Sequence, residues 1–304
     1  MNRLFRSDKG GDLRWGWSAF LLIGGTILSG IILNIIIVIT LTYLNVAQGM
    51  TRDAALEQAN LQSSGFVPQA ALSVLQMGVM FLLVRWLVTR MDNKLFSWAA
   101  LGLGRSPFRN RFIIMGVGLA IGFTTLTLFL GLMIGTIQYL GTGFELTSAS
   151  NVMVTLILGA LLALATGFTE EIAFRGYLQQ KISKRTKPLL AVSISAALFA
   201  VAHPWGNTTN TLLYLASAFF VGILFGVLFL RTGFLWMGIA LHTAWNYLQI
   251  SILSIRNGAD VRFAGAPLFI FEVVNDTGQM IIELCFILIM LAIVLWFIKP
   301  DVAT

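Results

Sequence analysis

Charge is scarce in this chain. Charged residues make up 11% of its 304 positions, and hydrophobic residues make up 57%. Soluble domains carry about 25% charged residues, so this composition excludes an ordinary soluble domain. The chain has one cysteine, Cys285, which excludes an internal disulfide and a cysteine-rich metal site. It has two histidines, so apart from carboxylates few side chains can exchange protons near neutral pH.

Long apolar runs fill most of the chain. Each run of about 20 apolar residues is long enough to cross a bilayer as a helix. The sequence therefore predicts an all-α, polytopic integral membrane protein with about eight transmembrane helices in a single membrane domain, residues 1–304. The expected spans are residues 17–44, 67–88, 112–140, 152–177, 188–203, 211–230, 234–255 and 280–298.

Some segments differ from this pattern. The fifth span is short because Pro204 and Gly206 follow it directly. The first run is too long for the apolar part of a signal peptide, so we expect it to remain as a span. Between spans, the polar, alanine-rich residues 47–69 predict a short surface helix, and residues 258–278 suggest a re-entrant or interfacial segment.

The basic residues are distributed unevenly between the two ends of these spans. Sixteen of the 20 lysines and arginines fall on one side of the eight-span arrangement. Cytosolic loops carry an excess of positive charge, so we expect both termini in the cytosol, at the plasma membrane if the host is bacterial. This bias accounts for the net charge of +7 without a nucleic-acid partner, and the basic loops can attract anionic lipids.

Polar side chains interrupt three of the spans at similar depths. Glu170, Glu171 and Arg175 lie within six positions of the fourth span, where each charge costs ~2.5–3.5 kcal/mol or more. At a helical rise of about 1.5 Å per residue, Glu170 lies about 21 Å, His203 about 22 Å and His242 about 16 Å from the basic ends of their spans. Since polar groups avoid lipid, we expect these side chains to pack around a wet cavity.

A spacing of four residues recurs among these polar positions. Glu171 and Arg175 are one helical turn apart and are expected to form an ion pair. His242 and Asn246 share one face of their helix, and Phe199 precedes His203 by the same step. A buried network that only fixes helix packing is the structural alternative for Glu171 and Arg175. Glycines such as Gly222 and Gly226 predict close helix packing rather than a phosphate site.

Three sequence motifs carry a family resemblance. Residues 169–177 read TEEIAFRGY, residues 199–203 read FAVAH, and residues 242–246 read HTAWN. In this order they resemble the EExxxR, FxxxH and HxxxN motifs of the CPBP family of intramembrane proteases. That family includes the CAAX prenyl proteases and the bacterial Abi or bacteriocin-processing proteins. The resemblance covers residues 152–250, which we interpret as the catalytic core.

The resemblance implies hydrolysis of a peptide bond by water that a glutamate activates. Glu170 would be the base, and His203 would position the water or the carbonyl. His242 and Asn246 would donate hydrogen bonds to the oxyanion, a contribution of ~2.7–4 kcal/mol per donor. Glu171, Arg175 and Phe199 would support this site. The substrate would be a peptide or protein, with prenylated proteins among the candidates.

Zinc is the main mechanistic alternative. Glu170, His203 and His242 make a reasonable ligand set because catalytic zinc commonly has three protein ligands and a water. The HExxH helix is absent, however, and no aspartate follows either histidine at short range to orient it. The sequence therefore favours hydrolysis without a metal cofactor.

Two other functional classes use buried polar clusters. A transporter also needs intramembrane carboxylates and histidines, but transporters commonly show paired broken helices in two repeated halves, and the sequence shows no such repeat. A non-catalytic scaffold or immunity protein can retain the motifs without turnover. Peptide cleavage by the purified protein distinguishes these classes.

Overall fold

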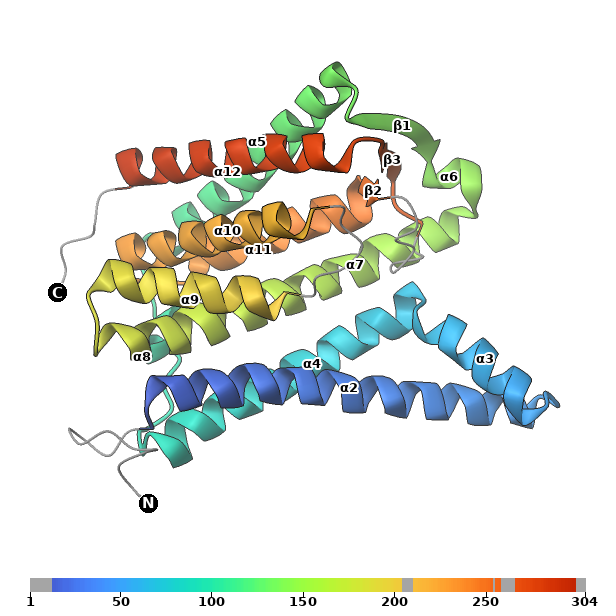
Figure 1. The fold of residues 1–304 in the computed structure, drawn as a ribbon, viewed down its shortest axis with the longest axis horizontal. Helices are drawn as coiled ribbons and strands as arrows, with labels where there is room; N and C mark the ends of the chain where they lie inside the picture. The colour runs from blue at the N-terminus through green and yellow to red at the C-terminus, as the bar shows by residue number, and fades with distance from the viewer. Residues whose placement is uncertain (1–12, 204–209, 254, 258–265, 299–304) are drawn as a thin grey trace.

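The computed structural model describes residues 13–203, 210–253, 255–257 and 266–298. Helices dominate these residues, as predicted (Figure 1). The long helices, with their continuations, are α2 (Trp15–Ala47), α4 and η1 (Phe66–Trp86, Leu87–Met91), α5 (Arg109–Ile134), α7, η3 and α8 (Ala149–Glu170, Glu171–Gln179, Gln180–Ser183), α9 (Pro188–Ala202), α10 (Thr211–Thr232), α11 and η4 (Trp236–Tyr247, Leu248–Ile252) and α12 (Asp276–Phe297).

The number of spans differs from the predicted eight. A helix occupies each predicted span, but within the described residues six helices are long and apolar enough to cross a membrane. The two that fall short are α9, which ends at Ala202, and α11, which begins at Trp236 and has 12 residues. Helix α9 ends close to the polar residues of the fourth span. Helix α11 passes close to the same residues.

A small sheet at one end of the bundle was not predicted. Helix α5 ends at Ile134 because Gly135 adopts a left-handed conformation with φ of 80°, so the expected span 112–140 was too long. The chain continues as β1 (Ile137–Thr142), which pairs antiparallel with β3 (Phe269–Val273). Strand β2 (Ile255–Asn257) pairs parallel with β3 on its other edge. Strand β3 lies in the expected interfacial segment, of which residues 258–265 lie outside the described residues.

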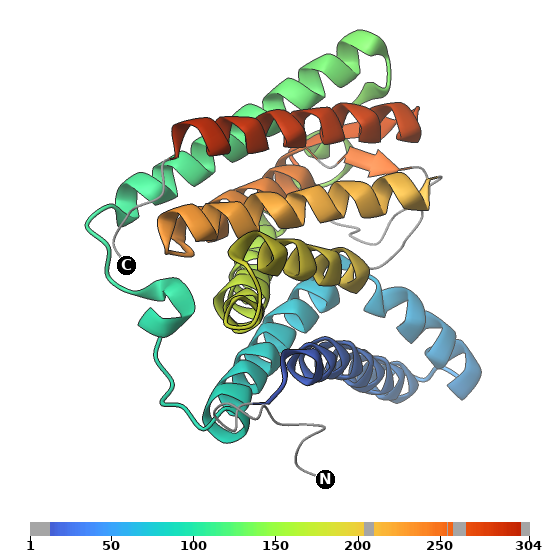
Figure 2. The same cartoon turned by 60° about the vertical axis from the view of Figure 1, so that its left-hand side comes forward.

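The helices form two groups on either side of α7. Helices α2 and α4 pack together on one side, with α4 also against α7, and α3 (Arg52–Ser63) is the predicted surface helix (Figures 1 and 2). On the other side, α11 packs between α5 and α7, while α10 contacts α9 and α12. Residues of three or more of these helices therefore meet at the middle of α7 and η3.

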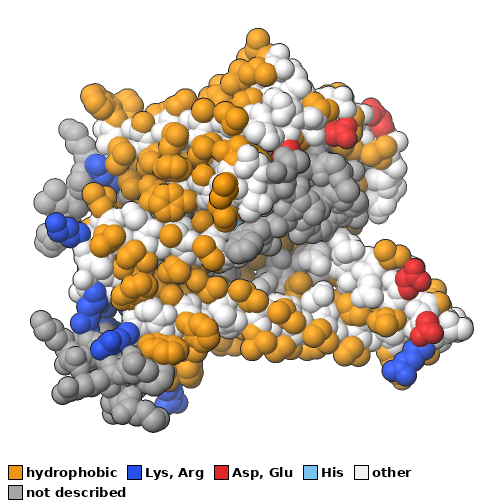
Figure 3. Space-filling view, viewed as in Figure 1, with side chains coloured by type: hydrophobic (Ala, Val, Ile, Leu, Met, Phe, Trp, Pro, Cys, Tyr) orange, Lys and Arg blue, Asp and Glu red, His pale blue; other side chains and the backbone are white. Residues whose placement is uncertain are grey.

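The outer surface is suited to lipid. Large apolar side chains are exposed along α2, α4, α5 and α12, and hydrophobic side chains are spread widely over the face shown in Figure 3. Lysine and arginine side chains gather at one end of this face, and aspartate and glutamate lie toward the other. Together with the six apolar helices, this surface makes the chain an integral, multi-pass membrane protein.

Candidate active site

A change of helix type marks the centre of the candidate site. Helix α7 ends at Glu170, and the chain continues without a break as the nine-residue π-helix η3, Glu171–Gln179. All nine residues of η3 are buried. π-Helical segments widen the turn and occur often at functional sites. Here the change of helix type falls between the two neighbouring glutamates.

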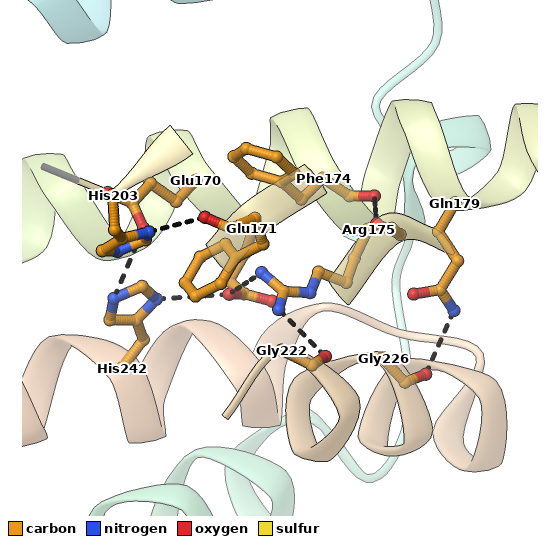
Figure 4. Close-up of polar contacts among 11 residues, drawn as sticks. Glu170, Glu171, Phe174, Arg175, Gln179, His203, Gly222, Gly226 and His242 are labelled. Atoms are coloured by element: carbon orange, nitrogen blue, oxygen red, sulfur yellow. Dashed lines mark hydrogen bonds and ion pairs between the residues drawn. The ribbon is translucent and has the colours of Figure 1, made fainter. Parts of the chain in front are cut away.

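Glu171 and Arg175 form the predicted ion pair. A carboxylate oxygen of Glu171 accepts a hydrogen bond of 3.0 Å from Arg175, and both side chains are only 1% exposed (Figure 4). Arg175 also donates to the carbonyl of Gly222 on α10, at 3.1 Å. A charged pair removed from water needs such additional hydrogen bonds to offset its desolvation. The pair therefore fastens the π-helix to α10.

Aromatic rings enclose the guanidinium of Arg175. Its central carbon lies 4.5 Å from the ring centre of Phe199, 5.2 Å from that of Phe225 and 5.9 Å from that of Phe174. Cation–π attraction to several desolvated rings stabilises a buried charge. Phe199 was expected to support the site, and the structure places it between His203 and Arg175, in contact with both.

His242 is a second partner of Glu171. Its Nδ1 is 3.2 Å from the same Glu171 oxygen that Arg175 contacts. Its ring stacks on Phe225 with a centroid distance of 4.9 Å and an interplanar angle of 17°. Because this carboxylate oxygen is paired with Arg175, Nδ1 of His242 donates the hydrogen bond. Nε2 of His242 then points toward Glu170.

His203 ends helix α9 and is oriented by the backbone. Its Nδ1 lies 2.8 Å from the carbonyl oxygen of Phe199, and this oxygen can only accept, so Nδ1 carries the proton. Its ring centre is 4.2 Å from that of Phe199. In the neutral tautomer, Nε2 of His203 therefore presents a lone pair, and it too points toward Glu170.

The carboxylate of Glu170 lies between the two histidines. Its Oε2 is 3.7 Å from Nε2 of His203 and 3.7 Å from Nε2 of His242. This oxygen is buried and has no hydrogen-bond partner among the described residues. The side chains of Glu170 and His203 nevertheless keep 24% and 26% exposure, in contrast to 1% for Glu171. Solvent thus reaches this part of the cluster and not the ion pair behind it.

The structure brings six of the seven predicted residues into direct contact. Asn246 is the seventh: it lies on α11 one turn after His242, with a half-buried side chain. Other contributors were not predicted. Gln179 donates to the carbonyl of Gly226 at 3.1 Å, and Ser195 donates to the carbonyl of Phe174 at 3.0 Å. Gln179 follows Arg175 by four residues, and Gly226 follows Gly222 by four residues. This matched spacing is a sequence signal that could have revealed the contact between Gln179 and Gly226.

The two histidines have orienting partners that the sequence did not reveal. Glu171 lies beside His242, and the Phe199 carbonyl lies beside His203, as the groups that orient zinc-bound histidines do. The donor types also suit zinc. Within the described part of the chain, however, no group of three or more His, Cys, Asp or Glu side chains is arranged to hold a metal ion. The zinc alternative therefore depends on the types of donor present rather than on an assembled set of ligands.

Comparison with known proteins finds a similarity in this part of the chain. Residues 151–248 match the family described as Rce1-like, type II CAAX prenyl endopeptidase. The matched segment is roughly a third of the chain and contains all seven predicted site residues. No curated protein and no solved structure matches the chain.

Proposed function

We propose that this chain, an intramembrane protease of the CPBP family by its Rce1-like segment 151–248, hydrolyses a peptide bond with water that Glu170 activates. The observation that supports this most directly is the unpartnered Oε2 of Glu170, which lies 3.7 Å from both histidine Nε2 atoms. In the proposed step, the attacking water binds beside these three atoms at hydrogen-bond distance. Glu170 takes the proton of that water as it attacks the carbonyl carbon.

The proposed step uses one particular distribution of charge. Glu170 and Glu171 carry two negative charges, and Arg175 carries one positive charge. A protonated His242 makes this set neutral, which a low-dielectric interior favours because each unbalanced charge there is costly. His242 is also the histidine with a carboxylate on each ring nitrogen, at 3.2 and 3.7 Å. His203 then remains neutral and accepts a hydrogen bond from the water through Nε2.

The same assignment serves the transition state. When Glu170 accepts a proton from water, it becomes neutral, and the negative charge moves to the carbonyl oxygen of the peptide. The Nε2–H of protonated His242 donates to this oxyanion, together with the amide of Asn246 one turn along α11. Preorganised donors in a site of low dielectric stabilise developing charge strongly. The number of charges inside the cluster stays constant throughout this step.

Zinc remains the alternative chemistry for this reaction. In that case Glu170, His203 and His242 would hold the ion, and both histidines would have to be neutral with their lone pairs turned toward it. The ion would act as a Lewis acid on the carbonyl and on bound water. The absence of an HExxH helix and the one-turn spacing of His242 and Asn246 on α11 favour the mechanism without metal.

The orientation of the chain follows from its basic residues. With the end of the bundle that is rich in lysine and arginine in the cytosol, both termini are cytosolic. Basic loops at that end contact anionic lipid headgroups. The substrate is a peptide or protein segment that reaches the level of Glu170 within the membrane; prenylated C-terminal peptides are one candidate class.

Cleavage of a peptide library by the purified protein tests this function. Mass spectrometry of the products identifies new termini, and Glu170→Gln serves as the matched inactive protein. Cleavage by the native protein alone supports the proposal. Equal products from both proteins, or none from either over a broad library, would favour the scaffold or transporter alternatives.

A further inference from the structure

We propose that the active site receives its peptide from the non-cytosolic side of the membrane. The substrate class is then the extracytoplasmic segment of a membrane-bound or exported peptide, rather than a C-terminus presented in the cytosol. This inference rests on the proposed function and on the orientation argued from basic residues. It is carried by a difference in burial between the two ends of the site.

The catalytic helix shows this difference most sharply. From Glu171 to Gln179, toward the cytosolic end, every residue is buried. Phe168, Thr169 and Glu170, toward the other end, are each partly exposed. The boundary between partly exposed and fully buried residues of this helix therefore falls between the two glutamates. Glu170 is the last residue on the partly exposed side of this boundary.

The three neighbouring helices change at the same level. On α10, residues 213–221 are partly exposed, whereas residues 224–228 are buried. On α11, the side chain of His242 is buried, whereas residues 246–250 beyond it are partly exposed. Helix α9 ends one residue before His203, and Phe199 one turn earlier is buried. All four helices that contribute to the site thus open it in one direction.

Two further layers close the cytosolic side. The first is the short helix η2 (Ala99–Leu103), which folds back from the cytosolic end against η3. The Gly102 carbonyl accepts a hydrogen bond of 2.9 Å from Leu235, and the Ala100 carbonyl accepts one of 2.9 Å from Gln180. A Cβ on Gly176 would lie 2.8 Å from the Leu101 carbonyl, so η2 leaves no gap there.

The second layer is a separate buried polar cluster. Asp92 is paired with Lys181 and accepts a hydrogen bond of 3.2 Å from Tyr177, which also contacts Ser18 at 3.3 Å. All four side chains are buried. They connect the start of α2, the end of η1, η3 and α8 near the cytosolic end of the bundle. A peptide from the cytosol would have to separate this cluster, η2 and the Arg175–Glu171 pair before it reached Glu170.

Among the described residues, the opposite side of the site is less tightly buried. On the half of the molecule away from the basic end, the face in Figure 3 is hollowed between the arm of α2 and α3 and the rest of the bundle. A pocket of about 430 Å³ opens on this side, between β3 and the first turns of α4 and α7. An extended peptide spans about 3.3 Å per residue, so a short segment suffices to pass from the non-cytosolic surface to mid-membrane. The site is therefore suited to peptides that lie at the outer leaflet.

Cysteine accessibility in intact cells tests the direction of access. Cys285 is the sole cysteine, so Cys285→Ser gives a cysteine-free background. On it, Thr166→Cys lies one turn outward of Glu170, and Ala218→Cys lies one turn outward of Gly222. Ala173→Cys, on the buried cytosolic side of Glu170, is the matched control. The probe is a sulfonated methanethiosulfonate that cannot cross membranes. After denaturation, maleimide–polyethylene glycol is added and increases the apparent mass of any protein whose thiol is still free. A thiol that the probe has blocked gives no such mass shift.

In intact cells we expect the Thr166→Cys and Ala218→Cys variants to lose the mass shift. The Ala173→Cys variant should retain it, because its thiol reacts with the probe only after denaturation. Two exposed positions mark the sides of the membrane. Ser64→Cys, before α4, should be blocked in intact cells, whereas Ser183→Cys, at the end of α8, should be blocked only after permeabilisation.

Each part of the inference has its own contrary outcome. Reversal of the two markers would overturn the orientation. Protection of both reporter positions in intact cells would overturn the direction of access. Labelling requires no turnover, so these outcomes are independent of whether Glu170→Gln abolishes cleavage.

Discussion

Nδ1 of His242 lies 3.2 Å from Oε1 of Glu171, although 71 residues separate them in the chain. The same oxygen binds Arg175, so one carboxylate connects the motif of η3 to the motif of α11. Glu171 is thus more than a partner for Arg175. It fixes the ring of His242 so that Nε2 faces Glu170.

Glu170→Gln should abolish hydrolysis while the protein still inserts and folds. Glutamine keeps the shape of the side chain but cannot accept a proton from water. The measurement is product formation from a cleaved peptide, with thermal unfolding in detergent as the folding control. Near-normal turnover in this variant would exclude Glu170 as the base and direct attention to Glu171.

Arg175→Ala should lower the free energy of unfolding by ~3–5 kcal/mol, because it leaves Glu171 buried without its ionic partner. It also removes the hydrogen bond to Gly222 and the contacts with three aromatic rings. Thermal unfolding in detergent, measured alongside activity, checks this. Arg175→Lys is the matched variant: it retains the charge but not the forked geometry, so its loss should be smaller. A stable but inactive Arg175→Ala would instead indicate a direct role in substrate binding.

Gly222→Ala should destabilise the fold by ~1–3 kcal/mol through overpacking. A Cβ at this position would lie 2.8 Å from both Cα and Cβ of Ala196, and the shift would displace the carbonyl that Arg175 contacts. Gly118→Ala is the control, since a Cβ there meets no atom within 4 Å. We expect that control to be neutral or to stabilise helix α5 by up to ~1 kcal/mol. Equal effects of the two substitutions on thermal unfolding in detergent would contradict the close contact between α9 and α10.

Activity should survive prolonged chelation, and active protein should contain zinc well below one equivalent. The reason is the missing HExxH helix and the spacing of His242 and Asn246, which lie one turn apart on α11 and suit a pair of hydrogen-bond donors to one oxygen. Elemental analysis combined with chelation and metal add-back measures this. Stoichiometric zinc, with activity lost on its removal and recovered on its return, would establish the zinc mechanism instead.

The sequence by itself determined the class of the protein and the residues of the candidate site. Apolar runs long enough to cross a bilayer predict membrane helices from composition alone, and charges within them are too costly to be incidental. The four-residue spacing predicted the ion pair of Glu171 and Arg175 because helical neighbours are fixed by local geometry. The motif resemblance likewise pointed to the segment that the family match contains.

Tertiary structure decided what depends on contacts between distant segments. The bond between Glu171 and His242, the carbonyls of Gly222 and Gly226 as acceptors, and the sheet of β1, β3 and β2 all join residues far apart in sequence. The sequence predicted the shortness of α9 from Pro204 and Gly206, whereas the division of the seventh span into α11 and the π-helix η4 appeared only in the structure. The direction in which the site opens also depends on tertiary structure. It follows from which residues of four helices are buried, and that depends on how the helices pack together.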